Sequence, residues 1–90
     1  MPQELLSSDK KHVITRNGMN LGEMTGCNID TSKWVVTSII VQLHNEMAKQ
    51  LNVKKPFMKR ATMKIRPDQI RVVGDVIHLS VDLEALKTNL

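Results

Sequence analysis

Aromatic residues are almost absent from the chain, and their scarcity excludes one class of nucleic-acid-binding surface. They make up 2% of the 90 residues, as Trp34 and Phe57, and there is no tyrosine. Proteins that hold single-stranded nucleic acid without reading its sequence stack successive bases on several aromatic side chains. We therefore expect no stacking platform for single strands here.

Residues with the chemistry of catalysis or metal binding are also few. The single cysteine, Cys27, excludes an internal disulfide and a zinc site built from several cysteines. The histidines, His12, His44 and His78, lie far apart, and none has a second His or a Cys within four positions. The glycines form neither a dinucleotide-binding fingerprint nor a phosphate-binding loop. We predict no catalytic, cofactor-binding or metal-binding residues and no enzymatic activity.

Long hydrophobic runs are missing as well. The longest run, 34–41, is interrupted by Thr37 and Ser38, whereas a membrane-spanning helix needs about 20 apolar residues. The N-terminal stretch MPQELLSSDKK carries no cationic segment followed by an apolar block, so we expect no signal peptide and a cytoplasmic chain. The length and a hydrophobic content of 41% predict one folded domain, residues 1–90.

What the chain does have is a series of short strand patterns separated by turn signals. A β-branched run at 12–15 precedes Asn17-Gly18, a strong signal for a two-residue hairpin turn in which both residues take positive φ. We expect the return strand over 19–24. Gly22 inside that strand suggests a bulge or a barrel corner.

The most hydrophobic strand pattern covers 34–43, after a segment of turn formers at 28–33. Alternate residues from Val35 to Leu43 share one face, and those from Val36 to Gln42 share the other. Both faces are largely apolar, so we expect this strand to be covered on both sides, at least in its middle.

The rest of the chain alternates between helical and strand patterns. Apolar residues spaced by four predict a short helix over 44–51, and Ser80 is a suitable N-cap for a last helix over 80–88. A strand pattern at 57–66 and two short strands, 70–73 and 76–79, lie between them. Five or six strands with two short helices are typical of a small barrel or a curled antiparallel sheet.

Three stretches of the chain resemble one family. The first stretch has a strand, an Asn-Gly turn and a Leu-Gly-Glu return, in LLSSDKKHVITRNGMNLGEM. The second has a turn before a long apolar strand, in NIDTSKWVVTSIIV, and the third ends in a Val-Gly-Asp-Val-Ile hairpin, in MKIRPDQIRVVGDVIHL. In this order they resemble the PRC-barrel domain, in its short single-domain archaeal form. Over about 5–79, the resemblance implies a mainly β fold: a small six-stranded PRC-type β-barrel with an inserted helix at 44–51 and a C-terminal helix at 80–88.

The same resemblance implies an interaction module without catalytic residues. PRC barrels serve in the H subunit of photosynthetic reaction centres, in a ribosome-maturation factor and in stand-alone archaeal proteins. Some of the archaeal proteins act in cell division, as adaptors around the tubulin-like division protein and its membrane anchor. By resemblance we expect a non-enzymatic adaptor in an archaeal cytoplasmic complex, and the process implied is cell division.

Basic residues concentrate between 52 and 71, where seven basic residues and one acidic residue give the segment a charge of +6. Side-chain alternation places the basic residues of the 57–66 strand on its polar side. Three interpretations remain open: a solvated sheet edge guarded by lysines, a surface for an acidic protein partner, and a surface for nucleic acid or anionic lipid. The candidate basic patch consists of Lys54, Lys55, Lys59, Arg60, Lys64 and Arg66.

The apolar second face of the 34–43 strand is the other candidate site. Val36 and Ile40 cannot both point into a small barrel that the opposite face already fills, so either helices of this chain or another chain covers them. Trp34 and Met58 suit an adaptable contact surface. The candidate interaction surface is therefore Trp34, Val36, Ile40 and Met58, and the expected partner is a second copy or a related barrel.

Taken together, the sequence predicts an adaptor that acts as a dimer and docks another protein. The alternative is an RNA- or ribosome-associated assembly factor that uses the basic segment 52–71. Salt separates the two hypotheses, because binding to phosphates weakens steeply as the salt concentration rises.

Overall fold

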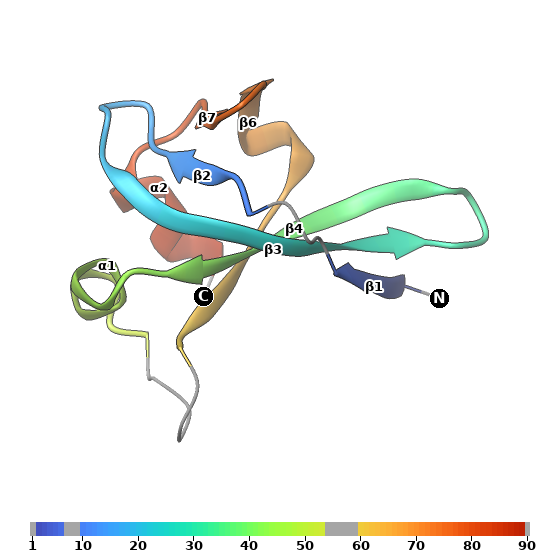
Figure 1. Ribbon diagram of the computed structural model, residues 1–90, viewed down its shortest axis with the longest axis horizontal. Coiled ribbons are helices and arrows are strands. Elements are labelled where there is room, and N and C mark those ends of the chain that lie inside the picture. The colour runs from blue at the N-terminus through green and yellow to red at the C-terminus, as the bar shows by residue number, and fades with distance from the viewer. Residues whose placement is uncertain (1, 7–9, 54–59, 90) are drawn as a thin grey trace.

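The computed structural model describes residues 2–6, 10–53 and 60–89, which form a mainly β structure (Figure 1). The prediction of a mainly β fold with two short α-helices is therefore confirmed. The strands are β1 (Pro2–Leu6), β2 (His12–Ile14), β3 (Asn20–Asp30), β4 (Val35–Leu43), β5 (Thr62–Ile65), β6 (Ile70–Val73) and β7 (Ile77–Leu79). The helices are α1 (Asn45–Gln50), α2 (Leu83–Leu86) and the single 3₁₀ turns η1 (Pro67–Gln69) and η2 (Lys87–Asn89).

These strands belong to one mixed sheet. Six of them lie in the order β5-β4-β3-β2-β7-β6, and β1 also pairs with β3. β2 and β7 run parallel, with Val13 opposite Ile77, and the other pairs are antiparallel. The end strands β5 and β6 are joined through η1, but no ladder links them in the described residues. The sheet is therefore open, and a closed barrel is not confirmed.

The β2–β3 hairpin forms where the sequence predicts it, but the predicted type of turn is wrong. The Thr15 N–H donates to the carbonyl of Met19 at 2.9 Å, and the Gly18 N–H donates to the carbonyl of Thr15 at 2.9 Å. The loop is thus 16–18, and within it only Gly18 has a positive φ, of 88°. A three-residue loop that ends in a left-handed glycine is the next most common way to join two antiparallel strands.

β3 and β4 form a long antiparallel hairpin whose outer half extends beyond β2 and β5 and pairs with β1 along β3 (Figure 1). The predicted strand over 19–24 is too short, and the prediction of a turn at 28–33 is wrong for its first three residues, which belong to β3. Asp30 lies opposite Val35 of β4 and Pro2 of β1. Pairing on both edges outweighs the low strand propensity of Asn and Asp.

The base of this hairpin depends on a close backbone approach at Gly22. A Cβ at this position would lie 2.0 Å from the carbonyl oxygen of Gln42, and the φ of Gly22 is 155°. The register between β2 and β3 shifts between Gly22, which pairs with Val13, and Asn20, which pairs with Ile14, so the predicted bulge is confirmed beside Gly22. Only glycine fits this close approach of β3 and β4 without moving the backbone.

The hydrophobic core draws side chains from five strands and both α-helices. Along β4, residues 38–41 are all buried, which confirms that the middle of this strand is covered on both sides. Each fully buried Leu, Ile or Val stabilises the fold by roughly 1.5–3 kcal/mol. The core residues are Val13, Leu21, Ile39, Val41, Leu43, Met47, Ala48, Leu51, Ala61, Met63, Ile65, Ile77, Leu79 and Leu86.

The inserted helix agrees with its prediction to within one residue at each end, whereas the C-terminal helix is shorter than predicted. α1 ends before Asn52, which takes a left-handed φ of 57°. α2 begins at Leu83, and its N-cap is Asp82, whose carboxylate accepts a hydrogen bond from the Ala85 N–H at 3.3 Å. The expected cap, Ser80, instead donates its N–H to the carbonyl of Gln69 at 2.8 Å, which joins it to the end of η1.

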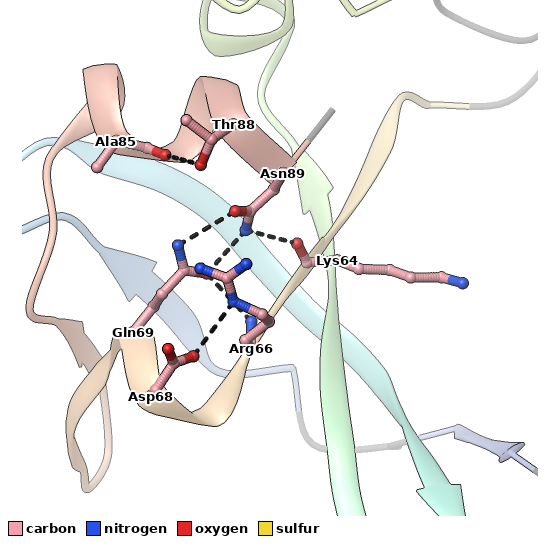
Figure 2. A network of polar contacts seen from close by, with 7 residues as sticks. All are labelled: Lys64, Arg66, Asp68, Gln69, Ala85, Thr88 and Asn89. Carbon is pink, nitrogen blue, oxygen red and sulfur yellow. Dashed lines mark hydrogen bonds and ion pairs between the residues drawn. The ribbon is translucent and has the colours of Figure 1, made fainter.

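The last helical turn joins β5 to η1 through the side chain of Asn89 (Figure 2). The Asn89 amide donates to the carbonyl of Lys64 at 3.0 Å and to Oε1 of Gln69 at 2.8 Å, and its Oδ1 accepts from Nε2 of Gln69 at 3.1 Å. Gln69 is buried, and its Oε1 also accepts from the Arg66 N–H at 3.2 Å. Both ends of this buried amide are therefore satisfied, as burial of a polar group requires.

Candidate interaction surface

The turn at the outer end of the β3–β4 hairpin is built around Asp30. Its carboxylate accepts hydrogen bonds from the Ser32 hydroxyl at 2.6 Å and the Ser32 N–H at 3.0 Å. Its carbonyl accepts from the N–H groups of Lys33, at 3.2 Å, and Trp34, at 2.7 Å. The Ser32 hydroxyl is the main reason that the pKa of Asp30 lies below its ordinary value. Asp and Ser specify this turn because their side chains bind nearby backbone groups.

Trp34 ends the turn in the left-handed conformation, with a φ of 57°. This conformation costs an L-residue roughly 1–2 kcal/mol, which is why glycine or asparagine is usual there. The Trp34 side chain is 78% exposed, so burial within this chain does not offset the cost. A strained backbone beneath an exposed aromatic side chain suggests a binding position rather than a packing position.

Two valines continue the apolar surface along β4. Val35 is 49% exposed and Val36 is 45% exposed. β5 pairs only with residues 39–42 of β4, so no strand of the described residues lies beside the two valines on that edge. We call the exposed apolar surface of Trp34, Val35 and Val36 the hairpin tip. Val35 and Val36 lie on opposite faces of the hairpin, and exposed apolar residues gathered at one end of a hairpin are typical of interaction sites.

The structure brings together only part of the predicted interaction surface. Trp34 and Val36 lie at the hairpin tip, whereas Ile40 is buried, so this chain itself covers Ile40 and leaves Val36 exposed. Val35 lies at the tip although its pattern assigned it to the inner face. The reason is that β2 and β5 end before this part of the hairpin and leave side chains on both faces of β4 exposed there. Met58 lies outside the described residues.

A second exposed apolar pair, on β6, was missed by sequence reasoning. Val72 is 51% exposed and Val73 is 62% exposed. β6 is an end strand that pairs only with β7 among the described strands. The sequence holds no signal for this exposure, because whether a short apolar strand is covered depends on distant elements that pack against it.

The described part of the basic patch lies along β5 and just beyond it. Ala61, Met63 and Ile65 are buried while Lys64 and Arg66 are exposed, so the predicted alternation is confirmed. An Arg66–Asp68 ion pair joins Nε to a carboxylate oxygen at 3.3 Å. Surface pairs of this kind contribute about 0–1 kcal/mol. Arg60 is half-buried, and its Nη2 lies 3.3 Å from Nδ1 of His44. Three members of the patch lie outside the described residues: Lys54, Lys55 and Lys59.

An open groove of about 480 Å³ lies at the opposite end of the hairpin, where β4 leads into α1. Two methionines contribute apolar surface, and the other residues contribute polar groups. Within the described part of the chain, no cluster of three or more His, Cys, Asp or Glu residues is placed to hold a metal ion. The groove is lined by Met19, Asn20, His44, Asn45, Glu46 and Met47.

Comparison of the chain with models of known protein families gives no match, and comparison with curated protein sequences gives no relative. In residues 2–6, 10–53 and 60–89, no helix has the length and apolar character that crossing a membrane requires.

Proposed function

We propose that the chain is a non-enzymatic protein-interaction module that docks its partners through the hairpin tip. One observation carries the proposal: Trp34 is 78% exposed while its backbone is held at a left-handed φ of 57°. Tryptophan is among the residues that most often dominate binding energy at protein interfaces. Its rigid ring loses little conformational entropy on binding, and the turn around Asp30 fixes its position before a partner arrives.

In this proposal the sheet is an incompletely closed form of the PRC-type β-barrel that the sequence resemblance implies. Two observations support it. η1 joins the end strands β5 and β6 directly, so the chain keeps the two open edges close together, as closure of a sheet requires. Asn89 then holds the end of β5 against η1 through hydrogen bonds to Lys64 and Gln69.

We further propose that the module is an archaeal adaptor, acting in the cytoplasm as a dimer or with a related barrel and recruited to the division site. This part depends on the resemblance alone. The test is a pull-down from nuclease-treated archaeal extract with the wild-type chain, with Trp34→Ala, and with Val73→Ala as the exposed control. We expect division proteins or a related barrel to bind wild type and Val73→Ala and to be lost with Trp34→Ala. Equal capture by all three would overturn the proposal.

The second candidate is an RNA- or ribosome-associated factor that uses the basic patch. The exposure of both Lys64 and Arg66 beside the end strand β5 favours it. In that case the affinity for RNA falls linearly with salt on a logarithmic plot, with a slope set by the phosphates contacted. The double substitution Lys64→Ala/Arg66→Ala would then lower the slope, whereas Trp34→Ala would leave it unchanged.

A further inference from the structure

We infer that the hairpin tip of one copy inserts Trp34 into the Met19–Met47 groove of a second copy, and that two copies do so reciprocally. The inference rests on the proposed function, in which the tip is the binding surface, and it names the partner as another molecule of this chain.

The groove has the chemistry to receive an indole. A volume of about 480 Å³ lies within the range of pockets that hold drug-sized ligands, so the groove has room for an indole. Met19 and Met47 both line it, and methionine sulfur makes favourable contacts with aromatic rings. A buried indole N–H needs an acceptor, and Asn20 and Glu46, whose side chains carry acceptor oxygens, are among the lining residues.

The charges beside the two surfaces are opposite. Lys33 precedes Trp34 in the turn and is exposed, whereas Glu46 in the groove lining is also exposed. Insertion of Trp34 brings the Lys33 ammonium of one copy toward the Glu46 carboxylate of the other. Such a pair at the edge of an interface sets orientation and selects the correct partner more than it adds affinity.

The position of the two surfaces allows both contacts to form at once. The tip and the groove lie at the two ends of the β3–β4 ladder, which runs from Gly22 opposite Leu43 to Asp30 opposite Val35. Figure 1 shows α1 and the hairpin tip at opposite ends of the longest axis, which measures 36 Å. Two antiparallel copies related by a twofold axis across the ladder therefore place each tip at the other copy's groove.

The area involved favours the reciprocal arrangement over a single contact. One tryptophan buries roughly 150–250 Å², whereas a stable interface buries about 800 Å² on each partner. A single tip in a single groove falls well below this value. Two tips, two grooves and the adjacent valines approach the lower limit of that size class, so we expect a weak, reversible dimer.

The experiment uses the fact that Trp34 is the only tryptophan of the chain. Sedimentation and tryptophan emission are measured on the full chain over a concentration series. We expect a monomer–dimer equilibrium in which the emission shifts to shorter wavelength in step with dimer formation. An emission that does not change with concentration overturns the inference, and so does assembly that grows beyond a dimer.

A charge swap tests the docking mode itself. Lys33→Glu and Glu46→Lys change exposed residues, so neither should unfold the chain. Each alone should weaken the dimer about fivefold or more, and the double variant should return to within about twofold of wild type. Singles without effect, or a double variant that shows the sum of both losses, overturn the proposed pairing.

Failure of this inference is distinguishable from failure of the proposed function. If the chain stays monomeric with Trp34 exposed while the pull-down still depends on Trp34, the tip binds a different protein, and only the inference fails. If dimer formation and the emission shift are weakened in the single charge variants and restored in the double variant, while Trp34→Ala captures the same proteins as wild type, the inference stands and the docking proposal fails.

Discussion

The backbone N–H of Trp34 donates a 2.7 Å hydrogen bond to the carbonyl of Asp30 and closes the turn at the end of the β3–β4 hairpin. The bond holds Trp34 at a φ of 57° while its ring is 78% exposed. The turn thus fixes the position of a large aromatic side chain that the core of the chain does not use. Strain and exposure coincide at one residue, and this coincidence sets the hairpin tip apart from the exposed valines of β6.

Substitution of Trp34 should separate stability from binding. Trp34→Gly relieves the left-handed strain and Trp34→Ala keeps it, so the glycine variant should be more stable than the alanine variant by roughly 1 kcal/mol. Urea unfolding measures the difference. Both variants should lose partner binding, because both lack the ring. A glycine variant less stable than the alanine variant would show that the tip is not strained.

The turn should weaken at acid pH through Asp30. Its hydrogen bonds with the Ser32 hydroxyl and N–H favour the carboxylate and lower the pKa of Asp30. A folded-state pKa below the unfolded value of about 3.9 adds stability above that pH, and this stability is lost as the pH falls through the folded-state pKa. NMR titration of the Asp30 carboxyl should give a midpoint below about 3.9, and Ser32→Ala should raise it. A midpoint at or above the ordinary value contradicts the described turn.

Two glycines should respond very differently to alanine. At Gly18 no heavy atom lies within 4 Å of an added Cβ, so Gly18→Ala should cost only the strain of φ at 88°, roughly 1–2 kcal/mol. At Gly22 the Cβ meets the Gln42 carbonyl oxygen at 2.0 Å, so Gly22→Ala should cost more than about 3 kcal/mol. Thermal unfolding of the two variants compares them. Similar costs would mean that the backbones of β3 and β4 do not approach closely at Gly22.

Removal of the Asn89 amide should loosen the end of β5. Asn89→Ala deprives the buried Gln69 amide of its Nε2 acceptor and removes one donor to its Oε1, so we expect a loss of about 1–3 kcal/mol. Thr88→Ala, at the exposed neighbouring position, should cost less than about 0.5 kcal/mol. Chemical unfolding of both variants measures the two losses in free energy of unfolding. Equal losses would assign the effect to the C-terminal turn as a whole rather than to the Gln69–Asn89 pair.

The sequence pattern predicted those strands and helices that neighbouring residues alone can specify. The apolar run of β4 and the four-residue spacing of Leu43, Met47 and Leu51, which predicts α1, each identify their element without distant partners. The outer half of β3 was missed because its Asn and Asp favour turns, and only the ladders with β1 and β4 hold them in a strand. The parallel pairing of Val13 with Ile77 joins segments far apart in the chain, and no local pattern indicates it.

The candidate site was predicted in part for the same reason. Trp34 and Val36 could be predicted because both faces of the 34–43 strand are apolar, and a small barrel can bury only one of them. The burial of Ile40 and the exposure of Val35 depend on where the rest of the sheet ends beside β4, which is a property of the tertiary structure. The sequence pattern also does not predict the left-handed backbone of Trp34, because tryptophan is rare in that conformation.

The most direct test of the hairpin tip as a protein-binding surface is photo-crosslinking in the native host. A photoreactive residue replaces Val36 in one variant and Val73 in the other, since both are valines on exposed strands, at 45% and 62% exposure. The account predicts protein crosslinks at position 36 and only background at position 73. Crosslinks at 73 with none at 36 would contradict the assignment of function to the β3–β4 hairpin.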